Sequence, residues 1–215
     1  MRYLILIFLL AACSKPKGED NFYFPCSTPD SPDVKRILII GDSISIGYSP
    51  HVINELCSQG HFVTRINVNG GPASKGLANI DSWLGGTHWD LVTFNFGYWD
   101  MVRPDIDEEV KELALEQYAE KLPLIAEKIK LKSDKAIFFT TTSPHNSPYH
   151  SDISAQEFNS AAIDALTGID NLTIYDLHAE SVNFYNYLLP DGYHYNVLGY
   201  SELGQFVIES ILTEI

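Results

Sequence analysis

A serine near one end of the chain and an aspartate–histidine pair near the other have the chemistry of nucleophilic catalysis. Ser43 follows Gly41 and Asp42 at a predicted strand-to-helix turn, where its own N–H can face a developing oxyanion. Asp191 and His194 stand three residues apart on a turn braced by a proline and a glycine. There the carboxylate would orient the imidazole, and the imidazole would take a proton from the serine. Each motif alone is short, and a helix-capping serine and a structural His–Asp pair are the alternatives.

The elements that must position these residues alternate between strand and helix patterns. Continuous β-branched runs predict strands, and helical spacing of apolar residues predicts helices. The predicted strands are 36–40, 62–68, 91–96, 136–142 and 172–175, and the predicted helices are 50–59, 75–84, 107–132, 155–167 and 196–212. Pro123 is expected to kink or divide the third helix. The alternation predicts an α/β fold, with a five-stranded parallel sheet in a three-layer α/β/α domain.

Ligands bind such a sheet beyond the carboxyl ends of its strands, so the loops there are informative. After the second predicted strand, Gly71 offers a backbone N–H and Asn69 a side-chain amide. A phosphate-binding loop is disfavoured because no Lys-Ser/Thr ending follows. After the third strand come Asn95, Tyr98 and Trp99, and the two aromatic side chains favour a ligand surface over simple packing.

In their order along the chain, these motifs resemble the blocks of the SGNH (GDSL-type) hydrolases. The matching blocks are Gly41-Asp42-Ser43, Gly71, Gly97-x-x-Asp100 and Asp191-x-x-His194. The resemblance implies a flavodoxin-like fold and a serine-dependent ester hydrolase that needs no cofactor and no metal. It implies that Ser43 is the nucleophile, His194 the general base and Asp191 the orienting carboxylate, with oxyanion donors at the N–H groups of Ser43 and Gly71. The residues expected to contact substrate are Asp42, Tyr98, Trp99 and Tyr193.

One position departs from the family pattern. The family usually has an asparagine two residues after the glycine of its third block, and this chain has Trp99 there. Losing one oxyanion donor can cost about 10²–10³-fold in rate. Asn95 would replace that amide from the strand end, or the Trp99 indole N–H would donate, and Asn69 is a further amide nearby. Alternatively, no side chain replaces the missing donor and the site is weakened or inactive. We expect a working enzyme, with Asn95 in its oxyanion hole.

The N-terminus predicts export. Residues 1–12 read as a lipoprotein signal peptide, because Arg2 is followed by an apolar run too short to span a bilayer of about 30 Å. The sequence Leu10-Ala11-Ala12-Cys13 resembles a bacterial lipobox, which implies cleavage before Cys13 and its lipidation. Residues 13–34 read as a tether and residues 35–215 as the hydrolase domain. By analogy with bacterial lipoproteins, Ser14 favours the outer membrane of the cell envelope.

The net charge of the chain limits its binding partners. The chain has 14 Lys and Arg against 28 Asp and Glu, a net charge of −14, which excludes nucleic acid and electrostatic docking on an anionic membrane. Membrane contact is therefore expected only through the N-terminal lipid.

Two cysteines remain besides Cys13. Cys26 and Cys57 would pair in an oxidising compartment or stay free, and both alternatives are open.

The histidines outside the matched blocks give weaker signals. The spacing of His145, His150 and Asp152 would suit metal ligands, but their loop is better interpreted as facing substrate, and we predict no metal. The other histidines show no partner pattern and are interpreted as structural: His51, His61, His88 and His178.

The predicted function is hydrolysis of a small-molecule or glycan ester. Export favours removal of small acyl groups, such as acetyl, from extracytoplasmic carbohydrate, on which Tyr98, Trp99, Tyr193 and Tyr195 would stack. A lysophospholipase-like or thioesterase-like hydrolase of longer acyl groups is the alternative. From another class of protein, a surface lipoprotein that only binds glycan also fits.

Overall fold

The apolar run before Ser43 forms the strand β1 (Arg36–Ile40), and its four apolar side chains are buried. The computed structural model describes Cys26 and residues 33–215. Within this part, β1 and the other four strands form one parallel sheet in the order β2-β1-β3-β4-β5. The others are β2 (Phe62–Arg65), β3 (Trp89–Phe94), β4 (Ser133–Phe139) and β5 (Leu172–Tyr175). The predicted five-stranded parallel sheet is confirmed.

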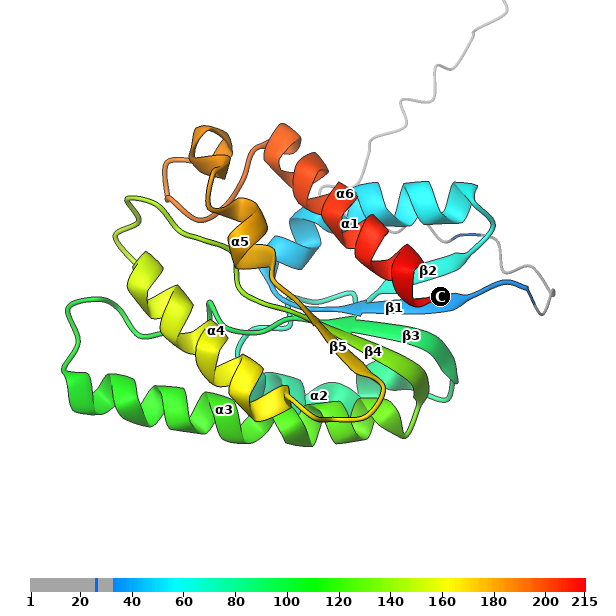
Figure 1. Ribbon diagram of the computed structural model, residues 1–215, viewed down its shortest axis with the longest axis horizontal. Coiled ribbons are helices and arrows are strands. Elements are labelled where there is room, and N and C mark those ends of the chain that lie inside the picture. Colours follow the sequence, from blue (N-terminus) through cyan, green and yellow to red (C-terminus); the bar gives the residue numbers. More distant parts are fainter. Residues whose placement is uncertain (1–25, 27–32) are drawn as a thin grey trace, which may run out of the picture.

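Helices cover both faces of the sheet (Figure 1). On one face α1 (Ser43–Ser58) packs against α6 (Val197–Glu214). On the other face lie α2 (Ala73–Leu84), α3 (Glu108–Lys130) and α4 (Asp152–Leu166), with α3 in contact with both neighbours. A short α5 (Leu177–Ser181) and a 3-10 helix, η1 (Phe184–Tyr187), connect β5 to α6. The predicted three-layer α/β/α architecture is therefore confirmed.

Several boundaries differ from the sequence-based expectation. The first helix starts at Ser43 rather than residue 50, because Asp42 caps it and Pro50 is accommodated inside it. Pro123 likewise lies within an unbroken α3, whose first turn is acidic and whose last turn is basic, as the helix dipole favours. Neither α5 nor η1 was expected, since five and four residues are too few to show helical spacing.

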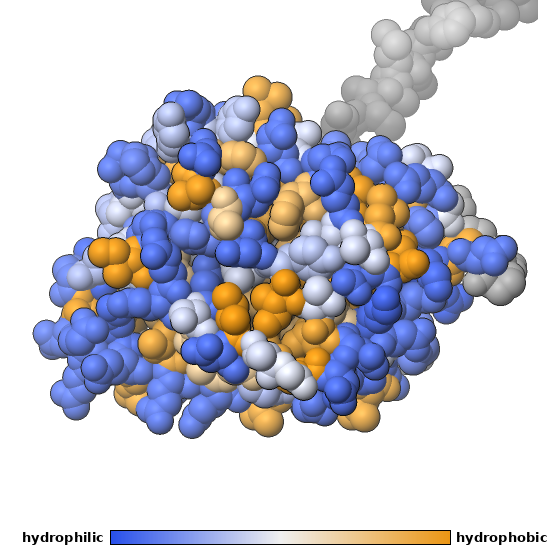
Figure 2. Space-filling view, in the orientation of Figure 1, coloured by the Kyte–Doolittle hydropathy of each residue, from blue (hydrophilic) through white to orange (hydrophobic). Residues whose placement is uncertain are grey.

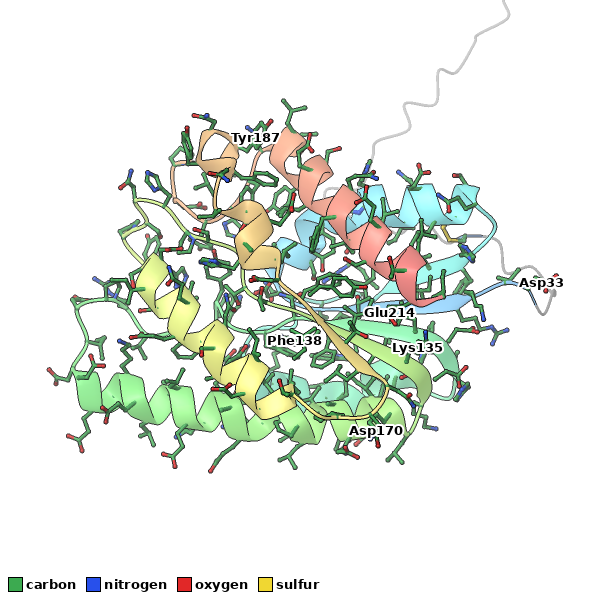
Figure 3. The ribbon with its side chains drawn as sticks, viewed as in Figure 1. Asp33, Lys135, Phe138, Asp170, Tyr187 and Glu214 are labelled. Atoms are coloured by element: carbon green, nitrogen blue, oxygen red, sulfur yellow. A yellow bond between two sulfur atoms is a disulfide. The ribbon has the colours of Figure 1, made fainter. Side chains whose placement is uncertain are left out.

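The ends of the sheet are tied to the helical layers. Figure 3 shows Phe138 at the centre of the sheet, and its side chain is fully buried. At the start of β4, Lys135 Nζ donates to the Glu214 backbone oxygen at 2.5 Å, which fixes the end of α6. The face seen in Figure 2 is largely hydrophilic, with separate apolar residues, in keeping with the acidic composition. No helix in the described part of the chain is long and apolar enough to cross a membrane.

Cys26 and Cys57 form a disulfide, with their Cα atoms 5.5 Å apart, which decides the alternative that the sequence left open. The Cys26 sulfur also accepts a hydrogen bond from the Val63 N–H at 3.3 Å. Residue 26 is thereby attached both to the last turn of α1 and to the beginning of β2. The predicted signal peptide, the lipidation site Cys13 and most of the predicted tether lie outside the described residues.

Candidate active site

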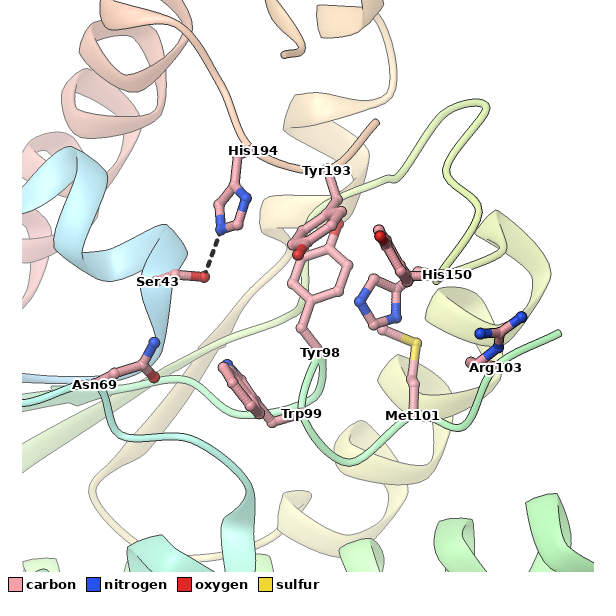
Figure 4. Close-up of a pocket in the computed structure, with 10 residues that line it drawn as sticks. Ser43, Asn69, Tyr98, Trp99, Met101, Arg103, His150, Tyr193 and His194 are labelled. Carbon is pink, nitrogen blue, oxygen red and sulfur yellow. Dashed lines mark hydrogen bonds between the residues drawn. The ribbon is translucent and has the colours of Figure 1, made fainter. Parts of the chain in front are cut away.

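Ser43, His194 and Asp191 lie in one hydrogen-bonded chain at the carboxyl edge of the sheet. Ser43 is the first residue of α1, directly after β1, and its Oγ lies 2.8 Å from His194 Nε2 (Figure 4). His194 Nδ1 lies 2.8 Å from Asp191 Oδ2. Because a carboxylate only accepts, Nδ1 carries the proton and Nε2 can accept from the serine hydroxyl. The fold thus joins residues 151 positions apart into the arrangement of a serine, a base and an orienting carboxylate.

The turn before α6 holds the carboxylate in its ionised form. Asp191 Oδ1 accepts from the backbone N–H groups of Tyr193 at 3.1 Å and His194 at 3.0 Å. Partial burial raises the pKa of Asp191, but its hydrogen bonds to His194 and Tyr193 outweigh burial and hold this pKa below its usual range. An ionised Asp191 can stabilise the imidazolium that forms when His194 takes a proton.

Asp42 and Asn95 face the protein interior behind the serine turn. Asp42 is fully buried, and its Oδ1 accepts from the Ile44 N–H and from Asn95 Nδ2, both at 3.0 Å. Burial raises the pKa of Asp42, although hydrogen bonds from Asn95 and Ile44 act against it. Gly41 leaves no room for a Cβ, which would collide with the Asn95 amide.

Two predictions about these residues are wrong. Asp42 is not placed to contact substrate, because its carboxylate is fully buried, caps α1 from the inside and does not line the pocket beside Ser43. Asn95 is not an oxyanion donor, because its side chain is 3% exposed, donates to Asp42 and does not line the pocket beside Ser43. The physical reason is the same for both residues, because their side chains are buried and hydrogen-bond to each other behind the serine turn.

A pocket of about 480 Å³ lies beside Ser43. Its aromatic walls are Tyr98, Trp99, Tyr149 and Tyr193, three of which were predicted substrate contacts. Trp99 is 56% exposed, whereas Tyr98 is buried and donates its hydroxyl to the Thr142 backbone oxygen at 2.8 Å. Figure 4 shows Tyr98, Trp99 and Tyr193 around the pocket together with its other lining residues: Ser43, Asn69, Met101, Arg103, His150 and His194.

His150 is a pocket residue whose role the sequence did not specify. Its ring centroid lies 4.8 Å from that of Tyr193 and 4.9 Å from that of Tyr98. Burial, helped by the nearby His194, lowers the pKa of His150 to about 4, so this ring is neutral at pH 7. In the sequence, the only sign that His150 lines the pocket was its place in a loop expected to face substrate. No sequence pattern indicated that Met101 or Arg103 lines the pocket.

Among the described residues, the three with metal-ligand spacing, His145, His150 and Asp152, do not form a metal site. His150 lines the pocket, and Asp152 Oδ1 instead lies 2.6 Å from Ser143 Oγ and 2.8 Å from His178 Nε2. This pairing ties α5 to the first turn of α4, which gives His178 a structural partner that its sequence context did not reveal. Within residue 26 and residues 33–215, no group of three or more His, Cys, Asp or Glu side chains is placed to hold a metal ion.

The loop after β2 differs from expectation at Gly71. The Gly71 N–H donates to Asn69 Oδ1 at 2.9 Å, so this expected oxyanion donor already has a partner. Nearby, Asp100 holds the first turn of α2, since its two carboxylate oxygens lie 2.9 and 3.1 Å from the Ala73 nitrogen. Burial raises the pKa of Asp100 to about 7, even though the Ala73 hydrogen bond lowers it.

Comparison with known proteins places this geometry in a family. Solved structures share the fold. The lipase/acylhydrolase from Enterococcus faecalis superposes with a TM-score of 0.66 at 23% sequence identity, and the match covers 82% of this chain and 95% of that protein's chain. The acetylxylan esterase Axe2 from Geobacillus stearothermophilus, at 17% identity and a TM-score of 0.66, covers 82% and 94%. No curated protein matches. A family model described as GDSL-like Lipase/Acylhydrolase matches residues 37–207, which include Ser43, Asp191 and His194. The chain therefore belongs to the GDSL-like lipase/acylhydrolase family.

Proposed function

We propose that this protein is a serine-dependent ester hydrolase that removes small acyl groups, such as acetyl, from carbohydrate outside the cytoplasm. The observation that carries the proposal is the hydrogen-bonded chain from Ser43 Oγ through His194 to Asp191, at the edge of a pocket with aromatic walls. Family membership supports acyl ester hydrolysis in general, and the substrate class is the finer part of the proposal.

The arrangement supports a two-step acyl transfer. Ser43 Oγ attacks the ester carbonyl carbon while its proton passes to His194 Nε2, and the carbonyl π electrons move to the oxygen. As the tetrahedral intermediate collapses, the bond to the alcohol oxygen breaks and that oxygen takes the proton from Nε2. Water then repeats the sequence on the acyl-serine, with His194 again as base, and releases the carboxylic acid and free Ser43.

The walls of the pocket support a sugar as the alcohol part of the ester. Tyrosine and tryptophan rings offer apolar faces on which a sugar ring can stack, while their polar edges tolerate water. Trp99 lies at the pocket with more than half of its surface exposed, a position that packing alone does not require. The Geobacillus protein is an acetylxylan esterase, which is consistent with this substrate class.

Hydrolysis of p-nitrophenyl acetate and of an acetylated xylo-oligosaccharide by the purified protein tests the proposal. Ser43→Ala should abolish turnover of both, whereas Ser160→Ala, at an exposed serine of α4, should leave it unchanged. Hydrolysis that survives Ser43→Ala would overturn the proposal. Retained oligosaccharide binding by a wild-type protein that shows no turnover would instead support the glycan-binding reading.

A second candidate, hydrolysis of longer acyl esters, is favoured by a separate apolar groove. This groove of about 580 Å³ lies between α1 and α6 and is lined by Ile46, Gly47, Pro50, His51, Asn54, Val197, Tyr200 and Ser201. Ile46 is 40% and Val197 84% exposed, and each lies three residues after a member of the Ser43–His194 pair. A rise in kcat/KM from acetyl to octanoyl p-nitrophenyl esters would favour this candidate, and a fall would favour the small acyl group.

We also propose that the protein is exported and attached to the cell envelope by lipid on Cys13. The support is the lipobox-like sequence together with the Cys26–Cys57 disulfide, since such bonds persist in oxidising compartments. Mass spectrometry of the N-terminus from native membranes should find a diacylglyceryl-modified Cys13. An unprocessed N-terminus would refute this assignment without affecting the esterase proposal.

A further inference from the structure

The oxyanion hole needs a side-chain donor that neither Asn95 nor an asparagine at the family position supplies. The family position for a side-chain amide holds Trp99, Asn95 is turned inward to Asp42, and the Gly71 N–H is bonded to Asn69. Of the two backbone donors that the resemblance implies, the Ser43 N–H is left, because the first N–H of a helix has no partner within that helix.

Asn69 lies in a loop that is fastened to the serine turn. The Gly70 N–H donates to the Gly41 carbonyl at 2.8 Å, and a Cβ on Gly70 would lie only 2.8 Å from that carbonyl oxygen. Only glycine permits this approach without a shift in the backbone. The Arg65 guanidinium joins the same two loops, since its Nη2 contacts the Gly41 oxygen at 3.4 Å and the Val68 oxygen at 3.3 Å.

The orientation of the Asn69 amide follows from its neighbour. Because the Gly71 N–H is a donor, the atom that receives it at 2.9 Å must be Oδ1, and this leaves Nδ2 on the other side of the amide. Figure 4 shows that nitrogen turned toward Ser43, with the Trp99 indole nitrogen beside the same space. Within the described part of the chain, no acceptor is hydrogen-bonded to Asn69 Nδ2.

We propose that Asn69 Nδ2 is the side-chain donor of the oxyanion hole and acts together with the Ser43 N–H. The inference rests on the proposed esterase function and assigns to the loop after β2 a role that family members give to the loop after β3. The bond from Gly71 to Oδ1 polarises the amide and strengthens its donation from Nδ2. It therefore makes Gly71 a positioning residue, which fixes Asn69 without contacting the substrate.

Two substitutions of Asn69 separate its donor group from its shape. Asn69→Asp keeps the size of the side chain and the acceptor for Gly71 but replaces the donor with an anion. Asn69→Ala removes both. Each should lower kcat for p-nitrophenyl acetate by about 10²–10³-fold with less change in KM, because the oxyanion exists only in the transition state. Asn67→Ala, at an exposed asparagine of the same loop, is the matched control and should leave kcat unchanged.

Ser43→Ala and Trp99→Phe complete the experiment. If Ser43→Ala abolishes hydrolysis but Asn69→Asp leaves kcat intact, the oxyanion assignment is overturned while the esterase proposal stands. If Ser43→Ala retains hydrolysis, the esterase proposal itself fails. A 10²-fold loss in Trp99→Phe beside an unaffected Asn69→Asp would identify the indole as the donor and overturn the proposal. Melting temperatures within about 2 °C of wild type in Asn69→Asp exclude a folding defect as the cause of its loss.

Discussion

Replacing Asp100 with asparagine should make the protein less sensitive to alkaline conditions. In the folded protein burial raises the pKa of Asp100 to about 7, from 3.8 in the unfolded chain. Between these values the folded state binds more protons than the unfolded state, so the free energy of unfolding falls as pH rises. The stability that neutral Asp100 contributes to the folded state is fully present below about pH 4 and is lost as pH rises through about 7. Asparagine can still accept the hydrogen bond from Ala73 but cannot ionise.

The magnitude follows from the pKa difference. Each pH unit between the two pKa values corresponds to about 1.4 kcal/mol, so the stability of Asp100→Asn relative to wild type should rise by up to about 3 kcal/mol between pH 5 and pH 8. Urea unfolding of both proteins at pH 5, 6, 7 and 8 measures this difference, and the other titrating groups, common to both proteins, largely cancel in it. A stability difference that stays constant across this range would refute the assignment of a raised pKa to Asp100.

Three other variants test separate parts of the structure. Asp191→Asn should lower kcat for p-nitrophenyl acetate by about 10⁴-fold, because the amide no longer fixes the tautomer of His194; a loss below tenfold in steady-state assays would argue against this role. The double substitution of Cys26 and Cys57 by serine should lower the free energy of unfolding by about 4 kcal/mol, as expected for a 31-residue separation, and chemical denaturation of the oxidised wild type beside the variant checks it. His150→Gln should reduce acid sensitivity, because the neutral His150 ring contributes stability that is present above pH 6.5 and lost as pH falls through about 4; equal slopes of melting temperature against pH for both proteins would contradict this.

The parts of the fold that were predictable depend on local patterns. After Arg36, the four remaining residues of β1 are all apolar, because β1 lies between β2 and β3 and both of its faces are covered by helices. This continuous apolar run allowed its bounds to be predicted as observed. Ser43 could be placed at the carboxyl edge of the sheet because it follows the first predicted strand. Its partnership with His194 was implied by the order of the motifs, which resembles that of the family.

The parts that could not be predicted depend on side-chain direction and on distant partners. Asn95 and Asn69 both follow strands at the same edge, and only the three-dimensional packing reveals that one faces Asp42 and the other the pocket. Likewise, His178 meets Asp152 across 26 residues of sequence, a separation that no local spacing rule covers. Burial of Asp100, which sets its pKa, also arises from packing rather than from its neighbours in sequence.

The disulfide fixes the point at which the N-terminal segment would join the domain. Cys57 stands 14 residues after Ser43 in α1, which at 1.5 Å per residue separates the two by about 21 Å along the helix. A lipid on Cys13 would therefore hold the domain at the amino edge of its sheet, through at most 13 residues that reach about 45 Å when fully extended. If the amino edge were toward the bilayer, Ser43 would face away from the membrane. That orientation would give soluble or polymeric esters direct access to the serine, whereas lipids still within the bilayer would meet the opposite end of the molecule.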